Sequence, residues 1–156
     1  NRFTIYELVH AVSVVEPPCL FGLHTTYTRN YTADSGGYYL RLPKSVIVRQ
    51  MMENDVFRFN FTNMLSSLAQ DTVNRLRRLP PQTTEAKITD LFSRQVLRPA
   101  GRKQIKCKMT DLAECVGETR LNVSRTLHKL EDAGLLSFTR GIIDIPYMEK
   151  LIAKVM

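Results

Sequence analysis

The sequence predicts an α+β fold in three parts: a partial set of antiparallel strands, a long helix, and a C-terminal winged helix-turn-helix. Three observations predict this order. β-Branched and aromatic residues dominate 3–42, a helical pattern without Gly or Pro runs from 55 to 79, and two short helical patterns joined at Gly117 precede a pair of strand patterns. We place the domain boundaries at 1–54, 55–80 and 81–156.

The composition is that of a folded protein. The chain has 156 residues, of which 44% are apolar, which is enough for a packed core. No run approaches the ~18 to 20 apolar residues of a membrane helix, and no signal peptide is visible. Cysteine occurs three times without C-x-x-C spacing, which is typical of reduced thiols. We therefore expect a cytoplasmic protein with no membrane partner.

The N-terminal segment contains the runs FTIYELV, AVSVV, TTYTRNYTA and YYLRL, separated by Pro and Gly pairs. This pattern predicts several antiparallel strands. Because roughly 40 residues are too few for an independently stable sandwich, and because the chain begins at Asn1 inside a strand pattern, we expect the rest of this domain to lie upstream.

A short helix is predicted from 45 to 54, and Asp55 is expected to cap the long helix that follows. One face of the long helix carries a narrow, mostly apolar stripe at steps of four or three residues. Its members are Phe61, Leu65, Leu68, Thr72, Leu76 and Leu79, of which the first five are expected to form a dimer interface. The stripe could pack on the β-segment of the same chain, but we favour a homodimer interface, because a helix of about 24 residues spans about 36 Å.

Beyond Pro80-Pro81, a helix is predicted from 83 to 97, capped by Thr83 or Thr84, with its inner face formed by Ile88, Leu91, Phe92 and Leu97. A loop at 98–103 and a short extended segment at 104–108 follow. After the helix-turn-helix, LLSF and IIDI flank a turn at Gly141, Pro146 ends the second strand, and 147–155 forms a short helix.

The helix-turn-helix pattern is TDLAECVGETRLNVSRTLHKLEDAGLL, residues 110–136. We expect Thr110 to cap a helix over 111–116, Gly117 to take a positive φ, and a second helix to run from about 119 to 133. The faces that hold the two helices together are predicted to be Leu112, Ala113 and Val116 on the first and Val123, Leu127 and Leu130 on the second.

The second helix turns a polar face outward at its start, as in a helix that enters the major groove of DNA. Arg120 and Arg125 could each donate two hydrogen bonds to guanine, because guanidinium is a planar fork. Hydroxyl, amide and basic groups around them are suited to phosphate oxygens. These candidate phosphate contacts are Thr110, Thr119, Asn122, Ser124, Lys129 and Arg140. The alternative is a plain αα-hairpin with a solvated basic face and an ordinary arginine in the strand turn.

Charge is concentrated in the same region. The net charge is +7, and the window from Arg94 to Lys129 holds nine Lys or Arg against three acids, hence +6 of the total. A polyanion-binding surface would concentrate charge in this way.

From DLAECVGETR to GLLSFTRGIIDI the chain resembles the DNA-binding domain of Crp/Fnr transcription regulators, and PPCLFG, YTA and LRLPKSVI follow the order of their upstream part. The resemblance implies a partial β-roll sensor domain at 1–54, a dimerisation helix, a homodimer on palindromic double-stranded DNA under effector control, and RNA polymerase as a partner. Base contacts in the family match Arg120, Leu121 and Arg125. Leu121 departs from the glutamate that many members carry, and a leucine could instead touch a thymine methyl.

The resemblance also places a possible effector pocket in the β-roll, at Phe21, Gly22, Tyr27, Thr28 and Arg29. Cyclic AMP is not expected there, because the family's glutamate after the FG turn and its Arg-Ser pair are not matched. The cofactor is therefore unknown. No metal site is expected, and His10 and His24 are interpreted as packing residues.

Two other function classes are compared with this one. An enzyme is not expected, because no histidine has a nucleophile or carboxylate at motif spacing. A winged-helix adaptor for an acidic protein partner, and a DNA-binding regulator whose β-roll takes no ligand, remain alternatives.

Overall fold

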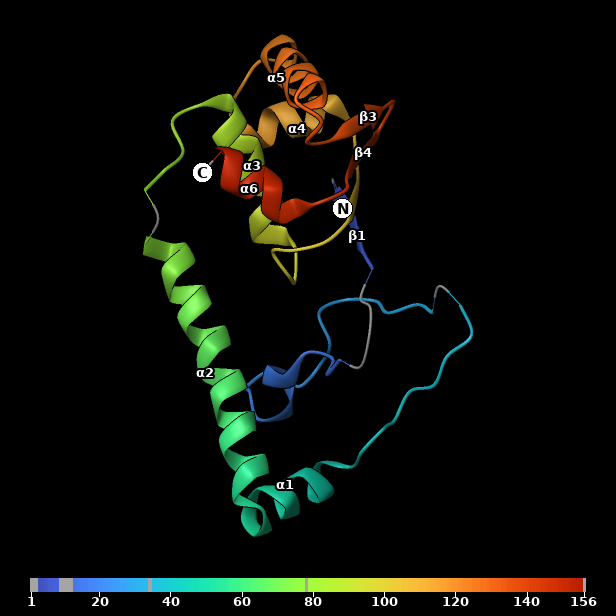
Figure 1. The fold of residues 1–156 in the computed structure, drawn as a ribbon, viewed down its shortest axis with the longest axis vertical. Helices are drawn as coiled ribbons and strands as arrows, with labels where there is room; N and C mark the ends of the chain where they lie inside the picture. The colour runs from blue at the N-terminus through green and yellow to red at the C-terminus, as the bar shows by residue number, and fades with distance from the viewer. Residues whose placement is uncertain (1–2, 9–12, 34, 78, 156) are drawn as a thin grey trace. The chain divides into compact units, whose positions relative to one another are not determined.

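The computed structural model describes residues 3–8, 13–33, 35–77 and 79–155. The chain divides into two compact units (Figure 1): residues 1–11 with 79–156, and residues 12–78. We describe each unit by itself. The boundaries expected at 54/55 and 80/81 stay a prediction, but the described strand at the N-terminus belongs to the same unit as the C-terminal residues.

The unit formed by 12–78 is mostly helix and loop. A short 3-10 helix, η1 (Pro17–Leu20), is followed by α1 (Lys44–Glu53) and the long helix α2 (Asp55–Arg77). The strands expected between residues 13 and 43 are absent from the described part of that range. A lone strand is not stable in water, because its backbone N–H and C=O groups need a neighbouring strand.

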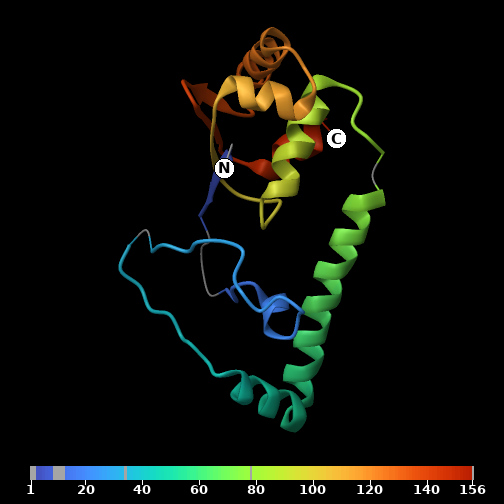
Figure 2. The ribbon, with the colours of Figure 1, turned by 180° about the vertical axis from the view of Figure 1, so that it is seen from behind.

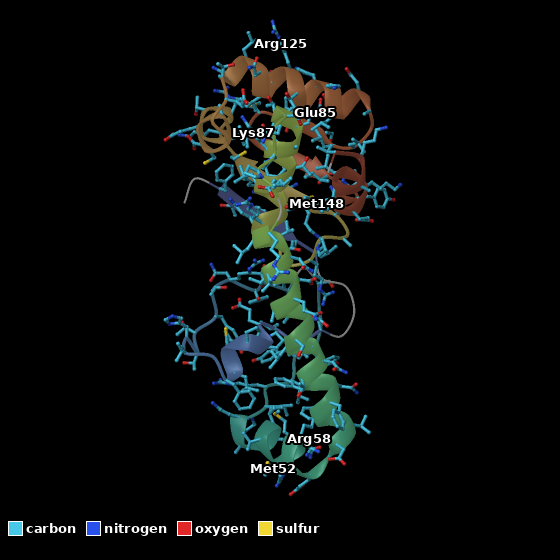
Figure 3. The ribbon with its side chains drawn as sticks, turned by 90° about the vertical axis from the view of Figure 1, so that its left-hand side faces the viewer. Met52, Arg58, Glu85, Lys87, Arg125 and Met148 are labelled. Atoms are coloured by element: carbon cyan, nitrogen blue, oxygen red, sulfur yellow. The ribbon has the colours of Figure 1, made fainter. Side chains whose placement is uncertain are left out.

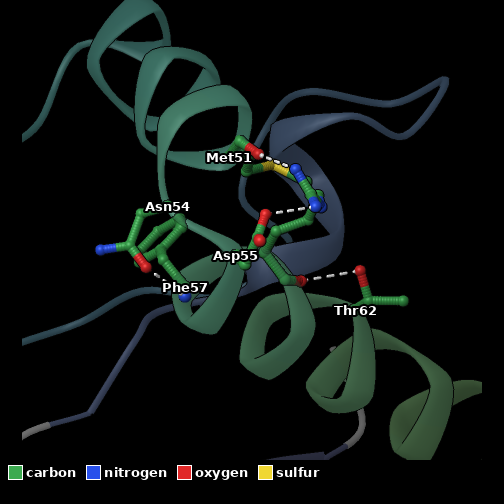
Figure 4. A network of polar contacts seen from close by, with 6 residues as sticks. Met51, Asn54, Asp55, Phe57 and Thr62 are labelled. Carbon is green, nitrogen blue, oxygen red and sulfur yellow. Dashed lines mark hydrogen bonds and ion pairs between the residues drawn. The ribbon is translucent and has the colours of Figure 1, made fainter.

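The junction of α1 and α2 corrects the expected cap. Asn54, not Asp55, caps α2, since its side-chain oxygen accepts a hydrogen bond from the Phe57 N–H at 3.0 Å. Asp55 instead forms an ion pair with Arg58 at 2.5 Å, and Arg58 also donates to the Met51 carbonyl at 3.3 Å (Figure 4). These contacts fix the bend between the two helices.

The apolar stripe of α2 is divided. Phe61 is only 9% exposed, because the Phe21 ring packs edge-on against it, with the ring centroids 6.0 Å apart, and the Phe57 ring stacks on it. Its packing partners therefore come from its own chain. Leu68 and Leu76 are exposed, at 37% and 81%, so the second half of the stripe is the part without a cover in this chain.

The other unit contains α3 (Thr84–Gln95), α4 (Met109–Val116), α5 (Arg120–Asp132) and α6 (Met148–Val155). Its antiparallel sheet has the order β1-β2-β4-β3, formed by β1 (Phe3–Glu7), β2 (Lys103–Cys107), β3 (Ser137–Thr139) and β4 (Ile142–Ile145). Viewed from behind, α3 and α6 lie side by side (Figure 2), and α3 also packs against α4 and α5. This arrangement confirms a winged helix-turn-helix.

The main hydrophobic core lies in this second unit. Ile88 and Phe92 of α3 are buried, as expected, and Thr83 is the residue that caps this helix. Leu91 and Leu97 are half-buried. The sheet and the helices α4, α5 and α6 also contribute fully buried apolar side chains: Ile105, Leu112, Val123, Leu127, Ile145, Met148 and Leu151. The core holds α5 against α3 and α4.

Candidate nucleic-acid interface

The turn between α4 and α5 has the expected geometry. Gly117 adopts φ 65°, and a Cβ at this position would have no neighbour within 4 Å, so its positive φ, rather than lack of space, favours glycine. Thr119 caps α5, since its hydroxyl accepts a hydrogen bond from the Asn122 N–H at 3.2 Å. Thr110 is not the cap of α4: that helix begins at Met109 after Lys108, and Thr110 lies exposed in its first turn.

The buried face of α5 is the predicted one. Val123, Leu127 and Leu130 are 0 to 3% exposed and face the core. Leu112, Ala113 and Val116 form the buried side of α4, as predicted. Because one face of α5 is fully used by packing, its opposite face is the one available to a partner.

The available face begins with the candidate base-reading residues. Arg120 and Arg125 are exposed, and Leu121 is 58% exposed. Arg125 lies on the outer side of α5, away from α3 (Figure 3). Among the residues that the structure describes, neither arginine has an acidic partner. Both guanidinium groups therefore remain available to an anionic or hydrogen-bonding ligand.

Other polar residues of this face already have partners. Asn122 donates from its side chain to Glu118 at 3.4 Å, and Lys129 forms an ion pair with Glu85 at 2.5 Å. Ser124 is half-buried, whereas Thr119 is exposed and keeps its hydroxyl proton as a donor. The six expected phosphate contacts thus do not form one free surface, because Lys129 is engaged and Ser124 is partly covered.

The concentration of positive charge is also reduced in the folded chain. Within the part of the chain that the structure describes, at least four of the nine cations in the basic window form ion pairs with acids that lie outside it. The pairs are Arg94–Asp90, Arg102–Asp144, Lys103–Glu7 and Lys129–Glu85. The remaining positive charge therefore depends more on Arg120 and Arg125 than the sequence count indicates.

Two ion pairs hold the start of α3 against the helix-turn-helix, and Figure 3 labels their members in α3, Glu85 and Lys87. The Lys87 ammonium lies 2.6 Å from the Glu118 carboxylate in the turn. The Glu85 carboxylate forms an ion pair with the Lys129 ammonium of α5. Hydrogen bonds from Lys87 and Asn122 hold the pKa of Glu118 below its usual value. No local sequence pattern predicted these pairs, because they join residues 31 and 44 positions apart.

The wing is a two-residue turn, Arg140-Gly141, between β3 and β4. Gly141 has φ 81°, and its carbonyl accepts a hydrogen bond from the Cys107 N–H at 3.1 Å. Arg140 is exposed at the tip. The ring centroids of His128 in α5 and Phe138 in β3 lie 4.8 Å apart. This contact joins α5 to the wing strand and fixes the tip relative to α5.

The residues expected in an effector pocket do not enclose one in the described structure. Phe21, Gly22, Tyr27, Thr28 and Arg29 are all exposed. Their assignment stays a prediction. His24 is exposed rather than packed, and His10 lies outside the described residues.

Glu16, which no sequence pattern singled out, organises this loop. Its carboxylate accepts hydrogen bonds from the Thr28 N–H at 2.9 Å, from the Thr28 hydroxyl at 3.1 Å and from the Tyr31 hydroxyl at 2.9 Å. Burial alone would raise the pKa of Glu16, but these hydrogen bonds outweigh it and lower that pKa. Burial and the Glu16 carboxylate raise the pKa of Tyr31 to about 12.

Neither a metal site nor a membrane span is found in the described residues. This part of the chain contains no group of three or more His, Cys, Asp or Glu placed to hold a metal ion. Within the same residues, no helix is both long and apolar enough to cross a bilayer.

The family of the C-terminal unit follows from its sequence and its geometry together. The Crp-like helix-turn-helix domain family matches residues 82–154, which include α3 to α5, the wing and all but the last residue of α6. Residues 82–154 are a Crp-like helix-turn-helix domain. The resemblance to Crp/Fnr regulators is therefore confirmed over this domain. No curated protein matches the chain.

The chain is also similar to solved structures, at low sequence identity. One, a candidate cyclic nucleotide binding protein from Ruegeria pomeroyi, is 16% identical over 72% of this chain and 50% of its own, with a TM-score of 0.45. Another, a CRP/FNR family transcriptional regulator from Thermus thermophilus, is 20% identical over 65% and 54%, with a TM-score of 0.42. This chain spans about half the length of each of these proteins.

Proposed function

We propose that this chain is part of a transcription regulator that binds double-stranded DNA in a sequence-specific manner through α5. The observation that carries the proposal is the division of α5 into two faces. Val123, Leu127 and Leu130 are buried, whereas Arg120 and Arg125 are exposed and have no acidic partner among the described residues. A helix of this kind presents its first turns to the major groove.

The roles of the residues follow from their chemistry. Arg120 and Arg125 read guanine through paired hydrogen bonds, and Leu121 contacts a thymine methyl. Phosphate contacts come from the exposed Thr119 hydroxyl, from Arg140 at the wing and from the exposed Thr110. Asn122 and Lys129 add further contacts after Glu118 and Glu85 are exchanged for phosphates, and the half-buried Ser124 adds one more.

We further propose that the regulator acts as a homodimer through the exposed half of the α2 stripe. Leu68 and Leu76 are its exposed apolar members, and Leu65 and Thr72 extend the same face. A two-fold dimer would place two copies of α5 in successive major grooves, which requires a palindromic site with half-sites about 34 Å apart. An effector sensed by residues 1–54 would change the positions of the two copies of α5 in the dimer. RNA polymerase would be the downstream partner.

Selection of bound duplexes from random DNA tests the proposal. The unaltered protein is expected to enrich one palindrome at physiological salt. Loss of binding to every duplex at physiological salt, or equal recovery of all sequences, would contradict it, and the second result would favour a basic surface that serves an acidic protein partner.

A further inference from the structure

The sheet of the Crp-like domain contains a strand from the opposite end of the chain. β1 pairs antiparallel with β2, so that Ile5 lies opposite Ile105 and Glu7 lies opposite Lys103. Phe3 and Ile5 pack against the core, and on the outer face Lys106 lies 4.8 Å above the Tyr6 ring. The alternation of FTIYE therefore matches the two faces of the sheet edge.

The end of β1 occupies a carboxylate-binding site. The Glu7 carboxylate lies 3.2 Å from the Lys103 ammonium, and their side chains are 10% and 2% exposed. It also accepts hydrogen bonds from the backbone N–H groups of Leu97 at 2.5 Å and Arg98 at 3.0 Å. Three donors from two different segments therefore converge on one carboxylate.

Lys103 forms its ion pair with this carboxylate, and a second acid, Glu149, is close enough to interact with its charge. Its ammonium also donates to the Ala100 carbonyl at 2.6 Å, but a carbonyl carries no full charge. Removing one partner of a buried ion pair is strongly destabilising, because the other charge stays buried without compensation. The site is thus built for an acidic side chain at one position along an added strand.

The chain order gives this contact a consequence. The compact unit that contains the Crp-like domain, residues 1–11 with 79–156, is called the Crp-like unit. Residues 12–78 are joined to it twice along the chain, once after β1 and once before α3. Moreover, β1 is followed in the sheet by β2, β4 and β3, and the last two carry the wing turn with Arg140. A displacement of β1 would therefore be transmitted through β2 to the strands that carry the wing.

We propose that the edge of β2, the Lys103 ammonium and the N–H groups of Leu97 and Arg98 form a docking site for an acidic strand, which residues 3–7 of the same chain fill as a releasable latch. The latch is a second connection between 12–78 and the Crp-like unit, besides the one that enters α3. The inference does not rest on DNA binding, because docking is measurable in the free protein.

Hydrogen exchange in the full chain tests the carboxylate site. In Glu7→Gln, the β2 amides that face β1 are expected to exchange roughly tenfold faster, because the latch opens more often. Glu53→Gln, the same change at an exposed position of α1, leaves them unchanged. In Glu7→Gln/Lys103→Met both charges are absent, and exchange returns towards the native rate.

Equal exchange in Glu7→Gln and the native chain would overturn the proposal. Exchange that stays fast in the double variant would also overturn the proposed pairing of Glu7 with Lys103, because the defect would then not be an uncompensated charge.

Cross-linking tests which chain supplies the strand. Thr4 and Lys106 are register partners, so Thr4→Cys/Lys106→Cys, with the three natural cysteines replaced, is expected to form an intrachain disulfide. Thr4→Cys/Thr139→Cys is the control, because β3 lies three strands away, roughly 14 Å. A disulfide that joins two chains, or none at all, would overturn docking within one chain.

Discussion

The Lys87 ammonium lies 2.6 Å from the Glu118 carboxylate, so the first turn of α3 holds the turn that precedes α5. The side chains are 31% and 18% exposed, and Asn122 donates to the same carboxylate. The position of α5 therefore depends on a contact outside the helix-turn-helix itself.

The first prediction concerns pH and Glu118. Its pKa is lowered in the folded state, chiefly by Lys87, so the ionised form is bound more favourably there. This stabilisation is present above the ordinary glutamate pKa of 4.5 and is lost as pH falls through the lower folded pKa. Glu118→Gln should lower the melting temperature at neutral pH, and the difference should vanish in acid. Asp132→Asn, an exposed change at the end of α5, is the control. A difference that persists in strong acid would contradict the assignment.

The second prediction concerns Lys129, which is expected to contact phosphate but forms an ion pair with Glu85 at 2.5 Å. Glu85→Gln releases the ammonium for DNA. Affinity at low salt should rise roughly threefold, and the slope of log affinity against log salt should steepen by up to about 1. Fluorescence anisotropy titrations measure both. The effect should disappear in Glu85→Gln/Lys129→Met, and an equal gain in that double variant would rule out this mechanism.

The third prediction concerns Leu121, which is 58% exposed between the two arginines. Leu121→Glu replaces an apolar contact by a hydrogen-bond acceptor, which suits the exocyclic amine of cytosine. Duplexes selected by this variant should therefore carry cytosine at one base of each half-site where the native protein selects thymine. Leu121→Ala should relax the choice without creating a new one. Identical selected sequences for all three proteins would place Leu121 outside the readout.

The fourth prediction concerns self-association through α2. Leu68 is 37% exposed on the apolar stripe, and Leu68→Glu places a charge where the partner helix is expected. Sedimentation equilibrium should show a dimer for the native chain and a monomer for this variant. Asn63→Glu, exposed on another side of α2, should remain a dimer. A dimer that survives Leu68→Glu would indicate a different interface.

Local patterns predicted the C-terminal unit well. The positive φ of Gly117 and the buried face of α5 follow from residues within a few positions of one another. The hairpin turn at Gly141 is confirmed for the same reason. Such features depend on backbone conformation and on periodicity, both of which are visible in a short window.

Long-range contacts were beyond these patterns. The run FTIYE was correctly predicted as a strand, but its partner, β2, lies about a hundred residues away, and no spacing indicates it. The ion pairs Glu85–Lys129 and Glu7–Lys103 were missed for the same reason. The prediction of strands between 13 and 43 was wrong for the described residues, because β-propensity alone provides no hydrogen-bonding partner.

The central claim is that Arg120 and Arg125 read bases. The most direct measurement is the ratio of affinities for the selected palindrome and a scrambled duplex at ~0.15 M salt, for the native protein and for Arg120→Ala/Arg125→Ala. Each arginine is expected to contribute about 1–3 kcal/mol of discrimination, so a native ratio of about 10³ or more should fall by at least about tenfold. Arg94→Ala, which removes a cation paired with Asp90, should leave the ratio unchanged. An unchanged ratio in the double variant would contradict the account.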